Sequence, residues 1–364
     1  MIALGLALMG LLVLRTLVAL ANAFEPRGYP DRVPLGPVLV SVLIPARNEE
    51  ARLPSLLADL RVQDWAAMEI LIGDDGSTDR TRGVIEEARL ADPRITLVDP
   101  GPLPEGWLGK AHNCDALARR ARGAVLLFLD ADVRVAPSLV RRTAARFDDP
   151  GLALTSLFPR QVRSSAGEEA MVPVMLWALL SLLPLGLVRR MKSPALAAAN
   201  GQLLAFRAED YHRIEPHSLV RRHPAEDIAI SRLYKAQGLG TEVAMAADEV
   251  SCRMYEGGAQ ALKGFTRNVV HWTGGHPLFL AVLALSLPLT PVAAGLIWGP
   301  VGVGVWLGLA VVLQASVARA AGEPVVQFLG WAPVRSAAFV VLAFRAIWVR
   351  VTGASVTWKG RRLD

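Results

Sequence analysis

Length, composition and charge place this chain among membrane proteins that carry a folded domain. Of its 364 residues, 52% are hydrophobic and 20% are charged, which excludes an ordinary soluble enzyme. The net charge of +6 is small and dispersed, so we expect contact with anionic lipid headgroups and no nucleic-acid partner. The two cysteines, Cys114 and Cys252, lack disulfide or metal spacing and are predicted to be buried thiols.

The N-terminal segment, residues 1–24, is predicted to be a transmembrane helix. Only Arg15 and Asn22 interrupt an apolar run that is long enough to cross a bilayer. Ala21-Asn22-Ala23 also resembles the cleavage site of a signal peptide. We favour a retained helix, because the run has no basic residues at its start and a cleaved, exported domain would lose access to cytosolic nucleotides.

The middle of the chain alternates strand and helix signals. Strands are predicted at 38–44, 69–72, 95–98 and 124–129, and helices at 49–62, 78–90, 110–122 and 137–147. Ser77 is the expected N-cap of the second helix. This alternation is typical of an α/β fold with a doubly wound, mostly parallel sheet and helices on both faces. Neither a dinucleotide-binding glycine motif nor a Walker motif follows the first strand, which disfavours a nicotinamide-dependent enzyme.

Acidic motifs directly follow two of the predicted strands. Asp74 and Asp75 come after the second strand, and Asp130 and Asp132 come after the fourth. Ligands of open parallel sheets bind beyond the carboxyl ends of the strands, so both motifs should line one crevice. Asp130 and Asp132 lie two apart in an extended segment and therefore face the same side, where they suit Mg²⁺ or Mn²⁺. The alternatives are a helix-start turn for the first motif and a solvated acidic loop for the second.

Apolar segments also dominate the second half of the chain. Residues 276–320 are predicted to form a transmembrane hairpin, because 278–318 contain no charge and Gly299-Pro300 interrupts them. Residues 171–188, and a helix at 336–349 within the final region 321–364, are predicted to lie in the membrane interface. With residue 1 outside, the soluble domain and a basic tail that includes Lys359 face the cytoplasm, in agreement with the positive-inside rule. We therefore predict a multi-pass protein of the cell membrane.

Five short segments give the chain a family resemblance. They are Pro45-Ala-Arg-Asn-Glu-Glu50, Asp74-Asp-Gly-Ser-Thr-Asp79, Gly109-Lys110, Asp130-Ala-Asp132 and Glu226-Asp227. Their order resembles that of glycosyltransferase family 2 across residues 38–275. Gly106-Trp-Leu-Gly-Lys110 and Val356-Thr-Trp-Lys-Gly-Arg361 look like a membrane-bound subgroup of carotenoid (diaponeurosporenoate-type) and hopene-associated glycosyltransferases. The resemblance implies a GT-A fold and inverting transfer of a sugar from a nucleotide-diphospho-sugar.

The same resemblance implies roles for individual residues. Asp227 would be the general base that deprotonates the acceptor, with a helix-start carboxylate as the alternative, and Asp132 would hold the metal together with Asp130. The residues expected to contact the nucleotide-sugar are Pro45, Arg47, Glu49, Asp74, Asp75, Lys110 and Asp130. Weaker candidates, for the acceptor or the diphosphate, are Glu226, Asn200, Gly201, Gln202, Gln260 and Lys263. A plain turn at 200–202 and a solvated basic helix around Lys263 explain those segments equally well.

Taken together, these features predict a membrane-bound, metal-dependent hexosyltransferase. It would move glucose from UDP-glucose, with Mg²⁺ or Mn²⁺, to a lipid-soluble acceptor such as a carotenoid or a hopanoid. One alternative is a processive polysaccharide synthase, but Gln260 and Lys263 stand where such synthases have Q-x-x-R-W, and the predicted spans are too few for a channel. The other is a non-catalytic membrane scaffold, against which the intact Asp75, Asp132 and Asp227 argue.

Overall fold

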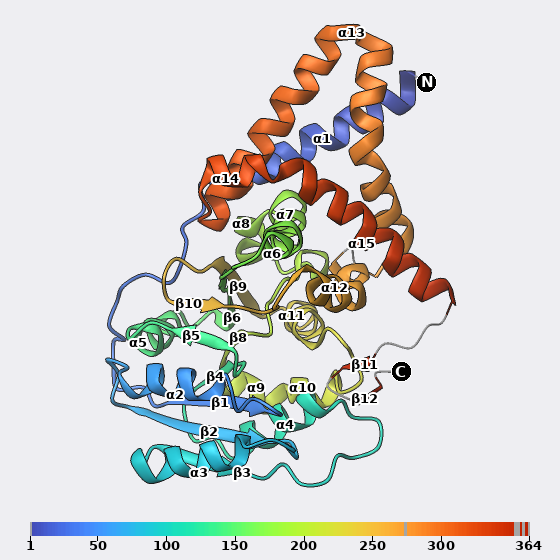
Figure 1. Ribbon diagram of the computed structural model, residues 1–364. Helices are drawn as coiled ribbons and strands as arrows, with labels where there is room; N and C mark the ends of the chain where they lie inside the picture. The colour runs from blue at the N-terminus through green and yellow to red at the C-terminus, as the bar shows by residue number, and fades with distance from the viewer. Residues whose placement is uncertain (1, 273–274, 353–356, 359–360, 363–364) are drawn as a thin grey trace. The chain divides into compact units, whose positions relative to one another are not determined.

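The computed structural model describes residues 2–272, 275–352, 357–358 and 361–362 (Figure 1). The chain divides into two compact units. The sheet unit comprises Pro26–Arg160 and Leu187–Arg253, and the helical unit comprises Met1–Glu25, Gln161–Gly186 and Met254–Asp364. Segments 161–186 and 254–275, which we expected in the catalytic domain, therefore group with the apolar helices. Lys359 of the predicted basic tail lies outside the described residues.

The sheet unit is built on seven strands in the order β3-β2-β1-β4-β8-β6-β9. These strands are β1 (Val40–Ala46), β2 (Met68–Asp74), β3 (Ile95–Val98), β4 (Val125–Leu129), β6 (Leu152–Phe158), β8 (Leu203–Arg207) and β9 (Gly240–Met245). β1 pairs parallel with β2 and β4, β2 with β3, and β6 with β9, whereas β8 runs antiparallel between β4 and β6. The prediction of an α/β fold with a mostly parallel sheet is confirmed.

Helices cover both faces of this sheet. They are α2 (Leu53–Arg61), α3 (Thr81–Ala91), α4 (Gly109–Ala118), α5 (Leu139–Arg146), α9 (Ala208–Ile214), α10 (Pro216–Leu219) and α11 (Glu226–Ala236), with a 3-10 turn, η1, at Pro194–Leu196. Leu43 of β1 and Leu126 of β4 share one core with Leu117 of α4. Side chains alternate along a strand, so Val42 and Ile44, which are also fully buried, need the second helical layer on the opposite face.

The predicted N-cap at Ser77 is wrong. Helix α3 begins at Thr81, and Asp79 Oδ1 accepts hydrogen bonds from the backbone N–H of Thr81 at 2.9 Å and from its hydroxyl at 2.5 Å. Ser77 Oγ instead accepts from the backbone N–H of Asn48 at 3.0 Å. The hydroxyl of Ser77 therefore links the turn after β1 to the turn after β2.

The short strands β5 (Val133–Val135) and β10 (Val250–Cys252) pair antiparallel, and β7 covers only Arg160–Gln161.

Three helices of the described chain are long and apolar enough to cross a membrane: α1 (Ile2–Asn22), α13 (Pro277–Ala321) and α15 (Ala332–Thr352). The remaining elements of the described chain are α6 (Ala166–Met171), α7 (Pro173–Leu182), α8 (Leu185–Arg190), α12 (Gly258–Trp272), α14 (Val325–Gly330), β11 (Thr357–Trp358) and β12 (Arg361–Arg362). Within α13, Gly299 adopts φ 61° and ψ −150°, a conformation open essentially to glycine alone. The interruption expected there is present, and Figure 1 shows α13 as two arms that fold back on each other.

Helix α15 is longer than expected. It has 21 residues and reaches the length of a span, although we expected a shorter interfacial helix at 336–349. The sequence hides this length because Arg335 interrupts its start, yet Arg335 is buried and donates to Gln314 Oε1 and to the carbonyl of Phe328. Residues 171–188 form only short helices, of which α7 has 10 residues. An interfacial position of either segment stays a prediction.

Arg15 and Asn22 of α1 both make side-chain hydrogen bonds inside the helical unit. Arg15 Nη2 donates to Ser181 Oγ at 2.8 Å. Asn22 Nδ2 donates to the carbonyl of Leu180 at 2.8 Å, and Asn22 Oδ1 accepts from the backbone N–H of Leu185 at 2.8 Å. These bonds satisfy backbone groups at the end of α7 and the start of α8, and the retention of α1 stays a prediction.

Replacing Asn22 with alanine should destabilise the helical unit, because it leaves buried backbone groups without partners. We expect the free energy of unfolding to fall by about 1–3 kcal/mol, seen as a lower melting midpoint of the detergent-solubilised protein. Leu17→Ala, on an exposed position of the same helix, is the matched control and should change the midpoint little. Equal midpoints for Asn22→Ala and the wild type would show that these bonds do not hold α1.

Candidate functional site

The first two motifs meet at the carboxyl ends of β1 and β2. Ala46 is paired with Asp74 in the strand register, and the backbone N–H of Asp75 donates to the carbonyl of Ala46 at 3.0 Å. Arg47 Nη1 donates to the carbonyl of Asp75 at 2.5 Å and lies 3.6 Å from its Oδ2. Pro45 is the neighbour of Ala46 in β1 and belongs to the same edge. The structure therefore brings these predicted nucleotide-binding residues together.

Glu49 and Asp74 are fixed by the same two turns. The backbone N–H of Glu49 donates to the hydroxyl of Thr81 at 2.7 Å, at the start of α3. Asp74 Oδ1 accepts from the backbone N–H of Ser77 at 3.0 Å, and Arg82 Nη1 lies 3.9 Å from its other oxygen. Asp74 is thus a turn-forming carboxylate as well as a candidate for ligand contact, so the structural alternative for this motif is partly correct.

Gly73 is a site residue that the sequence analysis missed. A Cβ at this position would lie 1.8 Å from Asn113 Oδ1, so any other residue would displace the side chain of Asn113. Asn113 Nδ2 in turn donates to the carbonyl of Gly73 at 2.8 Å. This close approach sets the start of α4, and with it Lys110, against the end of β2. A glycine at the end of an apolar strand is the one signal that pointed to it.

Lys110 is the centre of the site. Its ammonium lies 2.8 and 3.1 Å from the two oxygens of Asp130 and 3.2 Å from Glu226 Oε1, and it donates to the carbonyl of Gly201 at 3.3 Å. Burial lowers the pKa of Lys110, but the charges of Asp130 and Glu226 outweigh it and hold that pKa well above its ordinary value. A permanently charged ammonium therefore joins α4, the end of β4, the 200–202 turn and α11.

Asp227 lies beside this centre with both carboxylate oxygens engaged by backbone groups. Oδ2 accepts from the N–H of Gly201 at 2.9 Å, and Oδ1 accepts from the N–H of Ile228 at 2.8 Å. Burial first, and then the charge of Glu226, raise the pKa of Asp227 to about 6. A carboxylate with this pKa can accept a proton near neutral pH, which an ordinary surface aspartate does poorly.

The 200–202 turn has a structural role on both sides. Ser156 Oγ accepts from the N–H of Asn200 at 2.9 Å and donates to the carbonyl of Leu203 at 2.9 Å. The backbone N–H of Asp130 donates to the carbonyl of Gln202 at 3.2 Å. A Cβ on Gly201 would lie 3.1 Å from the ammonium of Lys110, so a side chain there would crowd the ammonium. Ser156 was missed, because nothing marks one serine within an apolar strand as special.

Asp132 fits a divalent cation. Its Oδ1 is buried and has no hydrogen-bond partner within the described residues. Burial and the charge of Asp130 raise the pKa of Asp132 to about 6. No cluster of three or more metal-ligating side chains occurs in the described chain. Mg²⁺ and Mn²⁺ suit such a site, since they accept one or two carboxylates and complete their shell with phosphate oxygens and water.

The remaining candidates lie elsewhere or are committed to other contacts. Asp130, the second predicted metal ligand, is paired with Lys110. Gln260 and Lys263 belong to α12 in the helical unit, so their part in the site stays a prediction. Cys252 accepts from Gln202 Nε2 at 2.7 Å, and burial raises the pKa of this thiol. As predicted, both cysteines are buried and free.

The known proteins to which this chain is similar are glycosyltransferases. Residues 41–213 match the family model described as Glycosyl transferase family 2. The 4,4'-diaponeurosporenoate glycosyltransferase of Staphylococcus haemolyticus is 28% identical over 235 residues, covering 63% of this chain and 60% of that protein. Its counterpart in Staphylococcus aureus strain MRSA252 is 27% identical over 274 residues, covering 68% and 65%. The chain thus matches less than two thirds of the length of these curated relatives.

A solved structure shares the fold. The mannosyltransferase from Pyrobaculum calidifontis, in complex with GDP-Man and Mn²⁺, superposes with a TM-score of 0.57 at 19% identity. The match covers 97% of this chain and 98% of that one. Likeness at this level of identity establishes the GT-A architecture of the chain and leaves its substrates open.

Proposed function

The chain carries a family 2 glycosyltransferase domain with the GT-A fold, and from this premise we propose that it is a membrane-bound, inverting glucosyltransferase. It transfers glucose from UDP-glucose to a lipid-soluble acceptor of the carotenoid type at the cytoplasmic face of the cell membrane. The observation that carries the proposal is Asp227, a half-buried carboxylate with a pKa near 6, held beside the Lys110 centre. The name of the relatives, diaponeurosporenoate glycosyltransferase, supports the carotenoid acceptor.

The donor is held at the edge formed by β1 and β2. Arg47 and Asp75 contact each other there and would bind the nucleoside, together with Pro45, Glu49 and Asp74. Lys110 would bind the diphosphate, because its ammonium is charged and lies at the start of α4, where backbone N–H groups favour anions. A divalent cation held by Asp132 and Asp130 would supply neutralisation of the charge on the departing diphosphate.

Asp227 would take the proton of an acceptor hydroxyl. The freed oxygen attacks the anomeric carbon as the bond to the diphosphate breaks, so the sugar configuration is inverted. The two backbone N–H groups on Asp227 keep its carboxylate oriented for this step. An acceptor that is itself a carboxylate, as the ending of the relatives' name indicates, arrives without this proton and depends less on the base.

The activity of the wild-type protein toward a hydroxyl acceptor should depend on pH through Asp227. Because the base must be deprotonated and its pKa is raised to about 6, we expect kcat/KM to fall about tenfold for each pH unit below 6 and to level off above it. The measurement is initial rate against pH at fixed UDP-glucose. A carboxylate acceptor should give a flatter profile, and identical profiles for both acceptors would contradict the assignment of the base.

The proposal is tested with the purified full-length protein in detergent. Labelled UDP-glucose is incubated with a carotenoid carboxylic acid or a hydroxylated lipid, with Mn²⁺ or with EDTA, and the lipid phase is examined by mass spectrometry. Metal-dependent gain of one labelled hexose supports the proposal. A non-catalytic scaffold gives neither transfer nor slow hydrolysis of UDP-glucose, and a processive synthase gives products of many hexoses. GDP-mannose serves as the competing donor.

A further inference from the structure

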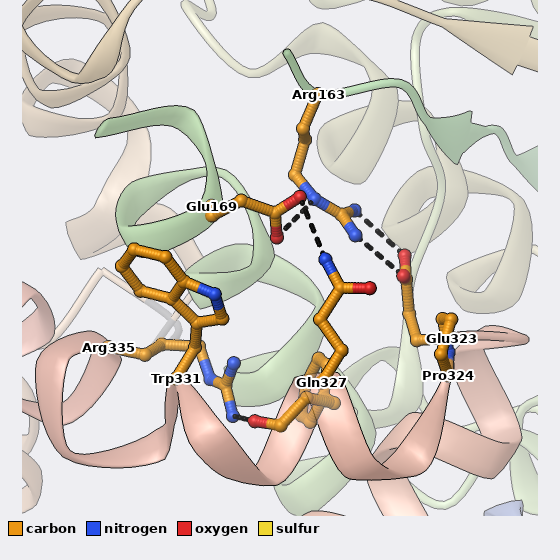
Figure 2. A pocket seen from close by; sticks show the side chains of 8 residues that line it. Arg163, Glu169, Glu323, Pro324, Gln327, Trp331 and Arg335 are labelled. Carbon is orange, nitrogen blue, oxygen red and sulfur yellow. Dashed lines mark hydrogen bonds and ion pairs between the residues drawn. The ribbon is translucent and has the colours of Figure 1, made fainter. Parts of the chain in front are cut away.

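A small polar hollow lies within the helical unit, where α13 ends and α15 begins (Figure 2). Its volume is about 10 Å³, which is room for roughly one water molecule or one oxygen atom of a ligand. The polar side chains around it are Arg163, Glu169, Glu323, Gln327, Trp331 and Arg335. None of these residues takes part in the candidate catalytic site.

On one side of the hollow, the charged side chains are paired with each other. Arg163 makes two parallel bonds to Glu323, at 2.8 and 2.6 Å, and a third to Glu169 at 3.0 Å. The side chains of Arg163 and Glu323 are each only 8% exposed. Gln327 Nε2 donates to Glu169 at 3.4 Å, which is a weak bond that leaves acceptor capacity on this carboxylate. Two carboxylates therefore more than neutralise the one guanidinium on this side.

The other side of the hollow has hydrogen-bond donors that lack a partner among the described residues. Arg335 is 1% exposed, and its Nη2 donates to Gln314 and to the carbonyl of Phe328. Its Nε is buried and has no partner in the described part of the chain. Figure 2 shows the indole nitrogen of Trp331 turned toward the space between Glu169 and Arg335, and no hydrogen bond to it occurs among the described residues. Charges around the hollow sum to zero, and the donors without partners among the described residues lie on the side of Arg335.

The hollow lies where lipid headgroups are expected. Glu323 follows the end of α13 directly after the Gly322 cap, and Trp331 immediately precedes α15; both helices have the length and composition of spans. Ends of transmembrane helices meet the headgroup region, where tryptophan is enriched because its ring is apolar and its N–H is polar. A ligand that reaches this position from the bilayer therefore presents a headgroup oxygen.

We propose that the hollow binds one hydroxyl oxygen of an uncharged lipid headgroup. The hydroxyl oxygen accepts hydrogen bonds from Trp331 and Arg335, and the hydroxyl group donates one to Glu169. A phosphate oxygen fits less well, since the hollow has no net positive charge and Glu169 and Glu323 would repel it. Only a group that both accepts and donates satisfies both sides of the hollow. This site is independent of the proposed glucosyl transfer.

The test is native mass spectrometry of the full-length protein released from detergent that contains one added lipid at a time. The lipids are dioleoylglycerol, which is uncharged and has one hydroxyl, dioleoylphosphatidic acid and dioleoylphosphatidylcholine. We expect the wild type to retain dioleoylglycerol about fivefold to tenfold better than the other two, as expected for one or two hydrogen bonds. Trp331→Phe, which keeps the ring and removes only the N–H, should lose most of this preference, as should Arg335→Met.

Controls separate this site from the candidate active site and from misfolding. Arg345→Met changes an exposed arginine of the same helix and should retain the wild-type preference. Asp227→Asn should also retain it, because that residue belongs to the sheet unit. A preference for phosphatidic acid, or an undiminished preference for dioleoylglycerol in Trp331→Phe, would overturn the proposal. Equal retention of all three lipids would also overturn it, because the hollow would then hold only water.

Discussion

Asp227→Asn is expected to reduce transfer to a hydroxyl acceptor by about 10²–10⁴-fold in kcat, the usual contribution of a positioned general base. Asparagine keeps the shape of the side chain and one oxygen that can accept from Gly201 or Ile228. The fold and the binding of UDP-glucose should therefore survive, with little change in the KM for the donor. Initial rates at saturating UDP-glucose measure the effect.

The matched control for this variant is Asp248→Asn. Asp248 belongs to the same unit, and its side chain is 83% exposed, so the same chemical change there should leave kcat within about twofold. Transfer to a carboxylate acceptor by Asp227→Asn should fall much less than transfer to a hydroxyl. Near-normal transfer to the hydroxyl acceptor would remove Asp227 from the role of base.

Lys110→Met is expected to have the second largest effect, on stability as well as on activity. It removes the ammonium shared by Asp130 and Glu226 and leaves two mostly buried carboxylates facing each other. Breaking a buried ion pair costs about 3–5 kcal/mol, and partial exposure of these three side chains places the expected loss near the lower end. Chemical denaturation of the purified protein, with Lys192→Met as the exposed control, measures it.

The same variant should also move the pH profile. The charge of Lys110 lowers the pKa of Asp227, in opposition to burial and to Glu226, so its removal should shift the profile for a hydroxyl acceptor to higher pH. A purely structural lysine would lower the rate without moving the midpoint. A double-mutant cycle with Glu226→Gln isolates the pair, and simple additivity of the two changes would show that they are not coupled.

The first four strands of the sheet were predictable, and the reason lies in particular segments. Residues 69–72 and 124–129 are apolar runs of strand length with turn residues after them, so both the strands and the crevice at their ends could be located. Local rules failed at Ser77. Helix α3 begins only at Thr81, whose backbone N–H donates to Asp79, while Ser77 accepts from the backbone N–H of Asn48 in the turn after β1.

The centre of the site was less predictable, because it depends on contacts distant in sequence. Lys110 was expected to contact the nucleotide-sugar, but nothing in its own neighbourhood indicated that it also binds Glu226 and the carbonyl of Gly201. Gly73 and Asn113 are 40 positions apart and fit each other only in the folded chain. Similarly, the full length of α15 was hidden by Arg335, whose charged group is buried against α13 and α14.

The stereochemistry of the product tests the central mechanism most directly. The purified protein is given UDP-α-glucose and a lipid acceptor, and the anomeric proton of the isolated glucolipid is examined by NMR spectroscopy. A single direct displacement assisted by Asp227 predicts a β-linked glucose. An α-linked glucose, or no glucolipid with any of the acceptors offered, would contradict it.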